Sequence, residues 1–160
     1  MANKDNTLAH LKVDNNIYPD FDLLFQTQRK LQKHLANIKG EHVDITNPEK
    51  LTLGQISDWM LRNKHAFDDE FSETMDALGG INDGIGSSVW KWWKSNNLIS
   101  DGVFLKDLSD SDLKELKMEY IDMLHFFINL GILLNITGSE MMNLYMAKNK
   151  ENINRQNIGY

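Results

Sequence analysis

The chain has 160 residues, of which 41% are hydrophobic and 25% charged, and its formal net charge is -6. This length is enough for a proper core, and we expect one domain over residues 1–160. The negative charge argues against a nucleic-acid polymer as partner, because proteins that bind such polymers present a basic surface. The chain has no cysteine, which excludes a disulfide framework, a thiolate nucleophile and a thiolate metal site.

No segment of the sequence predicts contact with a membrane. The N-terminus lacks the apolar core of a signal peptide. The longest apolar run, from Phe126 to Ile136, is interrupted by Asn129 and Asn135 and is too short to span a bilayer. We therefore expect a cytoplasmic protein.

The first half of the chain predicts two helices. Residues 1–18 lack a clear period and are expected to be loosely held, and a helix then starts at Pro19 and stops at Gly40. The second helix starts at a capping box formed by Thr52 and Gln55, in which each side chain covers the backbone N–H of the other. It ends at the two glycines 79 and 80, and its length favours a break near residues 62 and 63.

The second half predicts a loop and two more helices. A loop over residues 81–88 precedes an aromatic and basic cluster that contains Trp90 and Trp93. The third helix starts at Ser109 with Asp112, and a last helix runs from about Ser139 into the C-terminal tail. The third helix has an expected buried seam of Leu113, Leu116, Tyr120, Leu124, Phe127 and Gly131. With no strand pattern of useful length, the sequence predicts an all-α bundle.

Two pairs of carboxylates share a spacing of three residues. Glu119 and Asp122 lie in the most apolar helical pattern, and Glu70 and Glu73 repeat the spacing in the preceding helix. Residues three apart lie on one helix face, so two packed helices would gather these groups. Carboxylates near a core lose hydration and repel one another, so they need a cation or raised pKa values. Oxygen ligands favour Mg²⁺, with Mn²⁺ as a substitute.

Two alternatives stand beside this metal site. The helix of Glu70 and Glu73 also carries aspartates at positions 68, 69 and 76, so the pair also fits a solvated acidic face. Asp122 and His125 resemble half of a di-iron pattern that uses Glu-x-x-His on two helices. The other helix offers no histidine at the matching position, so His125 fits a supporting or core residue equally well.

The C-terminal segment carries a polar strip. Tyr145, Lys148, Asn152 and Arg155 recur at intervals of three and four residues, so a continuing helix aligns them on one face. Two cations and an amide there would bind phosphates, with arginine able to hold two oxygens at once. The alternative is a frayed, solvated chain end.

Several motifs occur together and in a fixed order. They are Gln28-x-x-Leu31-Gln32, Glu70-x-x-Glu73, Leu78-Gly79-Gly80, Ser88-Val89-Trp90-Lys91, Glu119-x-x-Asp122-x-x-His125-Phe126-Phe127 and Lys148-Asn149-x-x-Asn152-x-x-Arg155-Gln156-x-x-Gly159-Tyr160. This pattern resembles the dimeric, all-α dUTPases, and within them the T-even-phage type of dCTPase/dUTPase. The resemblance extends from about Leu23 to Tyr160, and the short chain departs from the longer cellular members.

The resemblance implies a fold of the all-α NTP pyrophosphatase (dimeric dUTPase/MazG-like) type and a reaction. The reaction is Mg²⁺-dependent hydrolysis of dCTP or dUTP to the monophosphate and pyrophosphate, which controls nucleotide pools in phage-type DNA metabolism. Glu70, Glu73, Glu119 and Asp122 match the metal ligands, which hold Mg²⁺ against the triphosphate. Glu70 and Glu73 would act in catalysis, with Glu73 helping to take the proton of the attacking water.

The resemblance also implies how the nucleotide binds. Lys148 and Arg155 would hold phosphate oxygens and Tyr160 would close on them, while Phe126 would pack on the sugar and leave no room for a 2′-hydroxyl. Gln28 and Asn152 match amides that face the pyrimidine. A primary amide offers both donor and acceptor, so it can pair with uracil or with cytosine.

Other implications concern partners and rival functions. The relatives are homodimers, and a phage-encoded enzyme would work in the host cytoplasm. Trp90 and Trp93 would stack on the base or serve in core packing. A MazG or dCTPase-like pyrophosphatase with other base specificity would share the acidic site, and a non-catalytic helical module would need no metal. The sequence does not decide between dCTP and dUTP.

Overall fold

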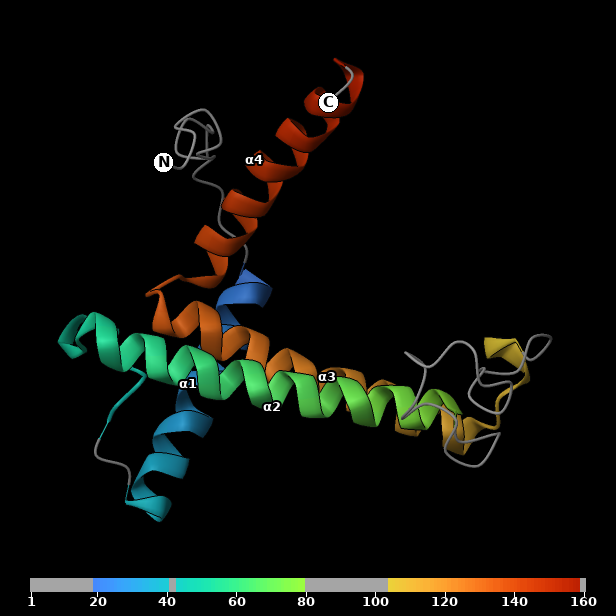
Figure 1. The fold of residues 1–160 in the computed structure, drawn as a ribbon, viewed down its shortest axis with the longest axis horizontal. Helices are drawn as coiled ribbons and strands as arrows, with labels where there is room; N and C mark the ends of the chain where they lie inside the picture. Colours follow the sequence, from blue (N-terminus) through green and yellow to red (C-terminus); the bar gives the residue numbers. More distant parts are fainter. Residues whose placement is uncertain (1–18, 41–42, 80–103, 159–160) are drawn as a thin grey trace. The chain divides into compact units, whose positions relative to one another are not determined.

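The computed structural model describes residues 19–40, 43–79 and 104–158, and these ranges are almost entirely helical (Figure 1). The long helices are α1 (Pro19–Lys39), α2 (Leu53–Gly79), α3 (Asp110–Leu133) and α4 (Gly138–Asn157), and the short 3-10 helices are η3 (Pro48–Lys50) and η7 (Leu105–Asp107). No strand occurs in these ranges, so the predicted all-α fold is confirmed.

The chain divides into two compact units. Unit 1 contains residues 1–51 and 131–160, and unit 2 contains residues 52–130 between them in the sequence. Unit 1 therefore holds α1, α4 and the last turn of α3, whereas unit 2 holds α2 and most of α3. A single functional domain over residues 1–160 stays a prediction.

In unit 1, the start of α4 is fixed to the start of α1. Asp22 accepts hydrogen bonds from the backbone N–H of Ser139, at 2.9 Å, and from its hydroxyl. Thr137 caps α4 by accepting from the N–H of Glu140 at 3.1 Å. The backbones at the starts of the two helices approach so closely that a Cβ on Gly138 would lie 2.3 Å from the carbonyl carbon of Phe21. These contacts make glycine at position 138 a requirement of the packing.

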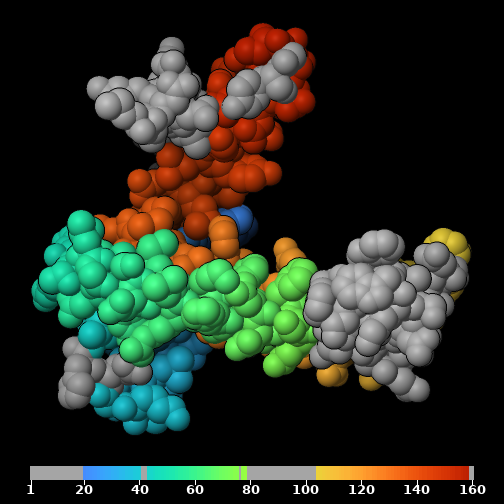
Figure 2. Space-filling model, viewed as in Figure 1, coloured from blue at the N-terminus to red at the C-terminus, as the bar shows by residue number. Residues whose placement is uncertain are grey.

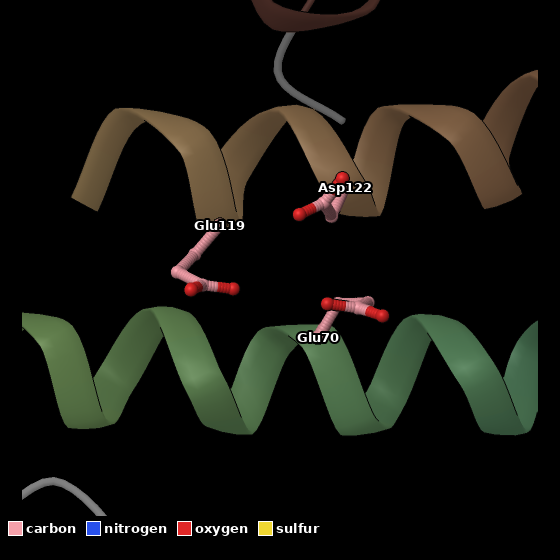
Figure 3. Close-up of side chains that lie close together, drawn as sticks. All are labelled: Glu70, Glu119 and Asp122. Atoms are coloured by element: carbon pink, nitrogen blue, oxygen red, sulfur yellow. The ribbon is translucent and has the colours of Figure 1, made fainter. Parts of the chain in front are cut away.

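In unit 2, α2 and α3 run antiparallel and side by side (Figures 1 and 3). The predicted capping box at Thr52 and the predicted helix start at Ser109 are both confirmed by hydrogen bonds. The Thr52 hydroxyl accepts from the N–H of Gln55 at 3.2 Å, while the Gln55 side chain accepts from the N–H of Thr52 at 3.0 Å. The Ser109 hydroxyl accepts from the N–H of Asp112 at 3.1 Å. Local side-chain chemistry therefore sets where both helices begin.

The predicted break of α2 near Asn63 is wrong, because the helix is continuous from Leu53 to Gly79. The Asn63 amide donates to the backbone carbonyl of Trp59, one turn earlier, at 2.8 Å. Its carbonyl oxygen accepts from the amide of Asn129 on α3 at 2.9 Å. The asparagine is thus held inside the helix pair and does not interrupt α2.

The predicted seam of α3 is partly wrong. Gly131 is buried as expected, but Tyr120 is 61% exposed and Phe127 is 48% exposed. The buried residues of α3 in unit 2 are Met123, Ile128 and Asn129. Because Asn129 and the carboxylates of α3 face α2, the contact face of the helix is rotated away from the purely apolar stripe.

The surface of the described helices carries many apolar side chains. The space-filling view shows the side chains of α2, coloured teal to green (Figure 2). Leu31 and Leu35 on α1 are each 38% exposed and Ile38 is 61% exposed.

None of the described helices is by itself long and apolar enough to cross a membrane. Only the bent pair of α3 and α4, taken together, reaches that length and composition.

Candidate metal centre

The site lies within unit 2, where α2 and α3 face each other. Glu70 projects from α2, and Glu119 and Asp122 project from α3 toward it (Figure 3). One carboxylate oxygen from each of the three lies within 4.8 Å of the others. The structure thus brings together three of the four predicted metal ligands, from segments about fifty residues apart in the sequence.

The carboxylates of this cluster destabilise one another's ionised form. Partial burial raises the pKa of Glu70, and the negative charges of Glu73, Asp122 and Glu119 raise it further. Partial burial also raises the pKa of Glu119, together with the charges of Glu73 and Asp122. A raised pKa means that the ionised form lacks compensating positive charge. A bound cation would supply that charge.

Glu73, the fourth predicted ligand, adjoins the cluster from α2. It is exposed, and its side chain is hydrogen-bonded to that of Glu119. This bond contributes to the raised pKa of Glu119. Glu73 stands one helical turn beyond Glu70, where it can receive a proton beside the cluster.

The donor set fits one hard divalent cation. Magnesium binds oxygen ligands at about 2.0–2.1 Å, so two ligands on opposite sides of the ion lie roughly 4 Å apart. The three oxygens all lie within 4.8 Å of one another, which is close to this spacing. A cluster made only of carboxylates is typical of Mg²⁺ or Mn²⁺ sites and leaves positions for water and phosphate.

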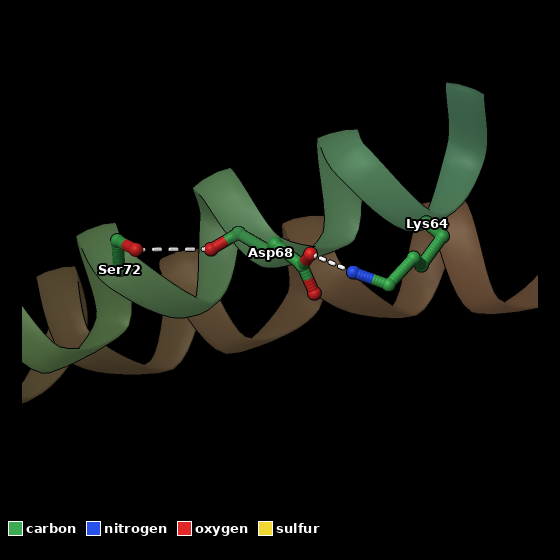
Figure 4. A network of polar contacts seen from close by, with 3 residues as sticks. All are labelled: Lys64, Asp68 and Ser72. Carbon is green, nitrogen blue, oxygen red and sulfur yellow. Dashed lines mark hydrogen bonds and ion pairs between the residues drawn. The ribbon is translucent and has the colours of Figure 1, made fainter. Parts of the chain in front are cut away.

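Asp68 on α2 fits the alternative prediction, a solvated acidic face. Asp68 forms an ion pair with Lys64, and its backbone carbonyl accepts from the Ser72 hydroxyl at 3.0 Å (Figure 4). Its side chain is 52% exposed. The predicted solvated acidic face therefore describes Asp68, whereas Glu70 points into the carboxylate cluster.

The remaining predicted residues of α3 lie next to the cluster in sequence. Phe126 and His125 are half-buried on α3, one turn after Asp122. The cluster contains carboxylates only and no histidine. The di-iron alternative, which needs a histidine ligand, gains no support from this arrangement.

The predicted nucleotide-binding residues of unit 1 lie on α1 and α4. Gln28 on α1 is nearly buried, at 3% exposure, and Asn152 on α4 is exposed. Lys148 is half-buried, and the Arg155 Nε donates to a carboxylate oxygen of Glu151 at 3.1 Å. The helix α4 continues to Asn157, so the prediction of a helical C-terminal segment is confirmed. Trp90, Trp93 and Tyr160 lie outside the described residues.

Sequence reasoning missed the buried asparagine pair of unit 2. The sequence predicts a break of the helix near residues 62 and 63, on the ground of its length, and an interruption of an apolar run at Asn129. A usable signal was present, because Asn63 precedes Glu70 by seven residues and Asn129 follows Asp122 by seven. Seven residues are two helical turns, so each asparagine lies on the same helix face as a carboxylate of the cluster.

Comparisons with known proteins identify relatives in phages. A dCTP pyrophosphatase of Enterobacteria phage T4 is 36% identical over 141 residues, which is 86% of this chain and 81% of the relative. A dCTP pyrophosphatase of Enterobacteria phage LZ5 is 37% identical over 99% of this chain and 92% of the relative. A DNA replication protein of phage T4 is 35% identical over 82% of this chain, but this match spans 34% of that longer protein.

No family model and no solved structure matches the chain. The two pyrophosphatases nevertheless match it over most of both lengths. They confirm the predicted likeness to the phage type and the predicted enzyme class, a nucleoside triphosphate pyrophosphatase. The chain belongs to the family of phage dCTP pyrophosphatases.

Proposed function

We propose that the protein hydrolyses dCTP, and also dUTP, to the deoxynucleoside monophosphate and pyrophosphate with the help of a divalent cation. The observation that carries this proposal is the cluster of Glu70, Glu119 and Asp122, whose carboxylate oxygens lie within 4.8 Å of one another. The names of the two phage relatives support the substrate class. Such an enzyme would control nucleotide pools in phage DNA metabolism.

The cation is Mg²⁺, with Mn²⁺ as a substitute, because the site offers oxygen ligands only. When bound, such an ion neutralises phosphate charge and lowers the pKa of a coordinated water. Glu70, Glu119 and Asp122 hold it in place between α2 and α3. Glu73 takes the proton of the attacking water, since it is exposed and lies beside Glu119 at the edge of the cluster.

The residues of α1 and α4 bind the nucleotide in this proposal. Lys148 and Arg155, with Tyr160, hold phosphate oxygens, and the ion pair with Glu151 fixes the direction of the Arg155 side chain. Gln28 and Asn152 read the base through amides that can pair with cytosine or uracil. Phe126 excludes a 2′-hydroxyl, and Trp90 or Trp93 stacks on the base.

A homodimer acting as a single-domain, cytoplasmic enzyme completes the proposal. The exposed stripe of Leu31, Leu35 and Ile38 on α1 supports a partner copy, because apolar side chains of this size gain by leaving water. The net charge of -6 favours a small nucleotide with its cation over a nucleic-acid polymer as ligand.

The test is a panel of dNTPs and NTPs incubated with the protein and Mg²⁺, with release of pyrophosphate as the readout. We expect turnover of dCTP and dUTP and none of the ribonucleotides, and chelation of the metal should abolish it. Broad turnover of purine and ribose substrates would contradict the proposed specificity.

Two matched variants test whether activity depends on the carboxylate cluster or only on the number of negative charges. Glu119→Gln removes one charge of the cluster and should lower kcat by at least about 100-fold, whereas Asp68→Asn removes a charge from the outer side of α2 and should leave kcat within about two-fold. Equal losses in the two variants would refute the assignment of the site.

A further inference from the structure

Among the described residues of unit 2, the most deeply buried side-chain hydrogen bond joins α2 to α3. The amide of Asn129 on α3 donates to the carbonyl oxygen of Asn63 on α2 at 2.9 Å. The two residues are 2% and 5% exposed, respectively. Asn63 in turn donates to the carbonyl of Trp59 at 2.8 Å, so its side chain is anchored to α2 before it meets α3. The pair is a fixed contact between helices.

This contact has a defined relation to the metal centre. In an antiparallel helix pair, a step forward on one helix is matched by a step backward on the other. Seven residues forward from Asn63 is Glu70, and seven residues back from Asn129 is Asp122, which are two members of the cluster. Three further residues lead to Glu73 and Glu119, which are hydrogen-bonded to each other. The asparagine pair and the carboxylates therefore obey one register.

Repulsion between the carboxylates favours a different register of α2 against α3. Like charges that face one another across two helices repel, and one carboxylate oxygen of each of Glu70, Glu119 and Asp122 lies within 4.8 Å of the others. Without a cation, a slipped register would separate them. Apolar contacts tolerate such slips, because they are not directional. The asparagine contact does not tolerate a slip, since a buried amide that loses its hydrogen-bond partner destabilises the fold by roughly 1–3 kcal/mol.

We propose that Asn63 and Asn129 are positioning residues that lock the register of α2 against α3 and thereby keep Glu70 opposite Asp122 before the cation binds. A single buried asparagine can fix the register of a coiled coil in the same way, at some cost in stability. The proposal rests on the proposed function only in taking the carboxylate cluster as the metal site.

The principal test replaces both asparagines by leucine. Exchange of both partners for apolar groups is close to neutral or stabilising, so Asn63→Leu/Asn129→Leu should fold with an unchanged or higher Tm. We expect its affinity for Mn²⁺, measured by titration, to fall about 10- to 100-fold, the loss typical of residues that orient metal ligands. A double variant that binds Mn²⁺ as tightly as the original protein overturns the proposal.

Thr74→Val is the matched control. Thr74 is also buried and donates to the carbonyl of Glu70 at 2.9 Å, so it is nearer to the cluster in sequence. Its hydrogen bond stays within α2, however. Loss of this bond should lower Tm and leave Mn²⁺ affinity within about three-fold. A loss equal to that of the double leucine variant would show that any buried polar contact has the same effect, which refutes a register function.

A conservative variant provides rescue. A buried aspartate is neutral at pH 6 when its pKa is raised by burial, and a neutral carboxyl can both accept from Asn129 and donate to Trp59. Asn63→Asp should therefore retain Mn²⁺ affinity within about three-fold, while Asn63→Leu loses it. If the double leucine variant does not fold, this pair of single variants decides the question, and equal affinities would overturn the proposal.

A second readout is independent of metal. Because the chain has no cysteine, single cysteines can be introduced for spin labels at the exposed positions Ser72 on α2 and Lys117 on α3. A slip of two helical turns displaces the labels by about 10 Å, at 1.5 Å per residue. We expect a narrow distance distribution with the asparagines present and a broadened or shifted one in the double leucine variant, and identical distributions would refute the proposal.

The wild-type protein separates this proposal from the proposed function. If wild type neither binds Mn²⁺ nor hydrolyses dCTP, the proposed function fails, and the label distances still test the register. If wild type is active and the double leucine variant matches it in affinity and in distances, only the register proposal fails.

Discussion

Substitution of Gly138 by alanine tests how tightly α4 is joined to α1. The added Cβ would lie 2.3 Å from the carbonyl carbon of Phe21 and 2.4 Å from the backbone N of Asp22. Carbon atoms in ordinary contact are about 3.5–4.0 Å apart, so the α1 backbone must retreat by more than 1 Å. Backbone, unlike the end of a flexible side chain, cannot give way by rotation.

The expected loss follows from two opposed effects. Overpacking of a tight contact costs typically about 1–3 kcal/mol, and the distances here place Gly138→Ala at the upper end. Alanine gains up to about 1 kcal/mol in helix propensity, less at the first residue of a helix such as this one. We expect a net loss of about 2 kcal/mol, which lowers Tm by roughly 4–8 °C in a chain of this size.

Two other glycines provide controls for thermal or urea unfolding. In Gly54→Ala the new Cβ meets only the Thr52 hydroxyl at 3.8 Å, so stability should be unchanged or slightly higher. In Gly131→Ala it meets the Met141 methyl and the Phe25 ring at 3.1 Å, where the side chains can shift, so the loss should be intermediate. A Gly138→Ala variant that unfolds at the temperature of Gly54→Ala would refute the close approach of the two helices.

Two further predictions concern pH. The pKa of Glu119 is raised in the folded protein, so without a cation the free energy of unfolding should fall as pH rises from the ordinary glutamate value, about 4.3, through the raised value. Glu119→Gln should reduce this fall, as should saturating Mg²⁺ in the original protein, and thermal unfolding across pH checks both; an unaltered slope in Glu119→Gln would contradict the repulsion. The pKa of Asp22 is lowered by the hydrogen bonds from Ser139, so its stabilisation is fully present above the ordinary aspartate value, about 3.9, and is lost as pH falls through the lowered value. Asp22→Ala should therefore lower Tm at pH 7 by more than at pH 3, and an equal shift at both would show that Asp22 acts by packing alone.

The parts of the fold that sequence predicted are those set by nearest neighbours along the chain. The capping box at Thr52 and the N-cap at Ser109 each depend on a residue three positions away, and both are present. Gly40, predicted to end the first helix, has a φ of 68°, which a residue without a side chain adopts freely. The three-residue spacing of Glu119 and Asp122 likewise placed both on one helix face.

The parts that sequence did not predict depend on which face of a helix meets another helix. Apolar spacing placed Tyr120 and Phe127 in the core, yet both are largely exposed, because the face of α3 that meets α2 includes polar residues. The break predicted near Asn63 depended on the length of the helical segment alone, and α2 is continuous there. The actual partner of Asn63, Asn129, lies 66 residues away, and no local pattern contains that information.

The division of the chain also dictates an order of assembly during synthesis. The partners Asp22 and Ser139 are separated by 117 residues, and all of unit 2 lies between them. At about 5–20 residues per second, α1 leaves the ribosome on the order of ten seconds before α4 exists. Unit 2 is continuous in sequence and can close in that interval, whereas Phe25 of α1, which is 3% exposed in the folded protein, stays uncovered until the rest of unit 1 is made. Slowing translation beyond Leu130 would lengthen that wait, and with it the time during which a chaperone can bind the first helix.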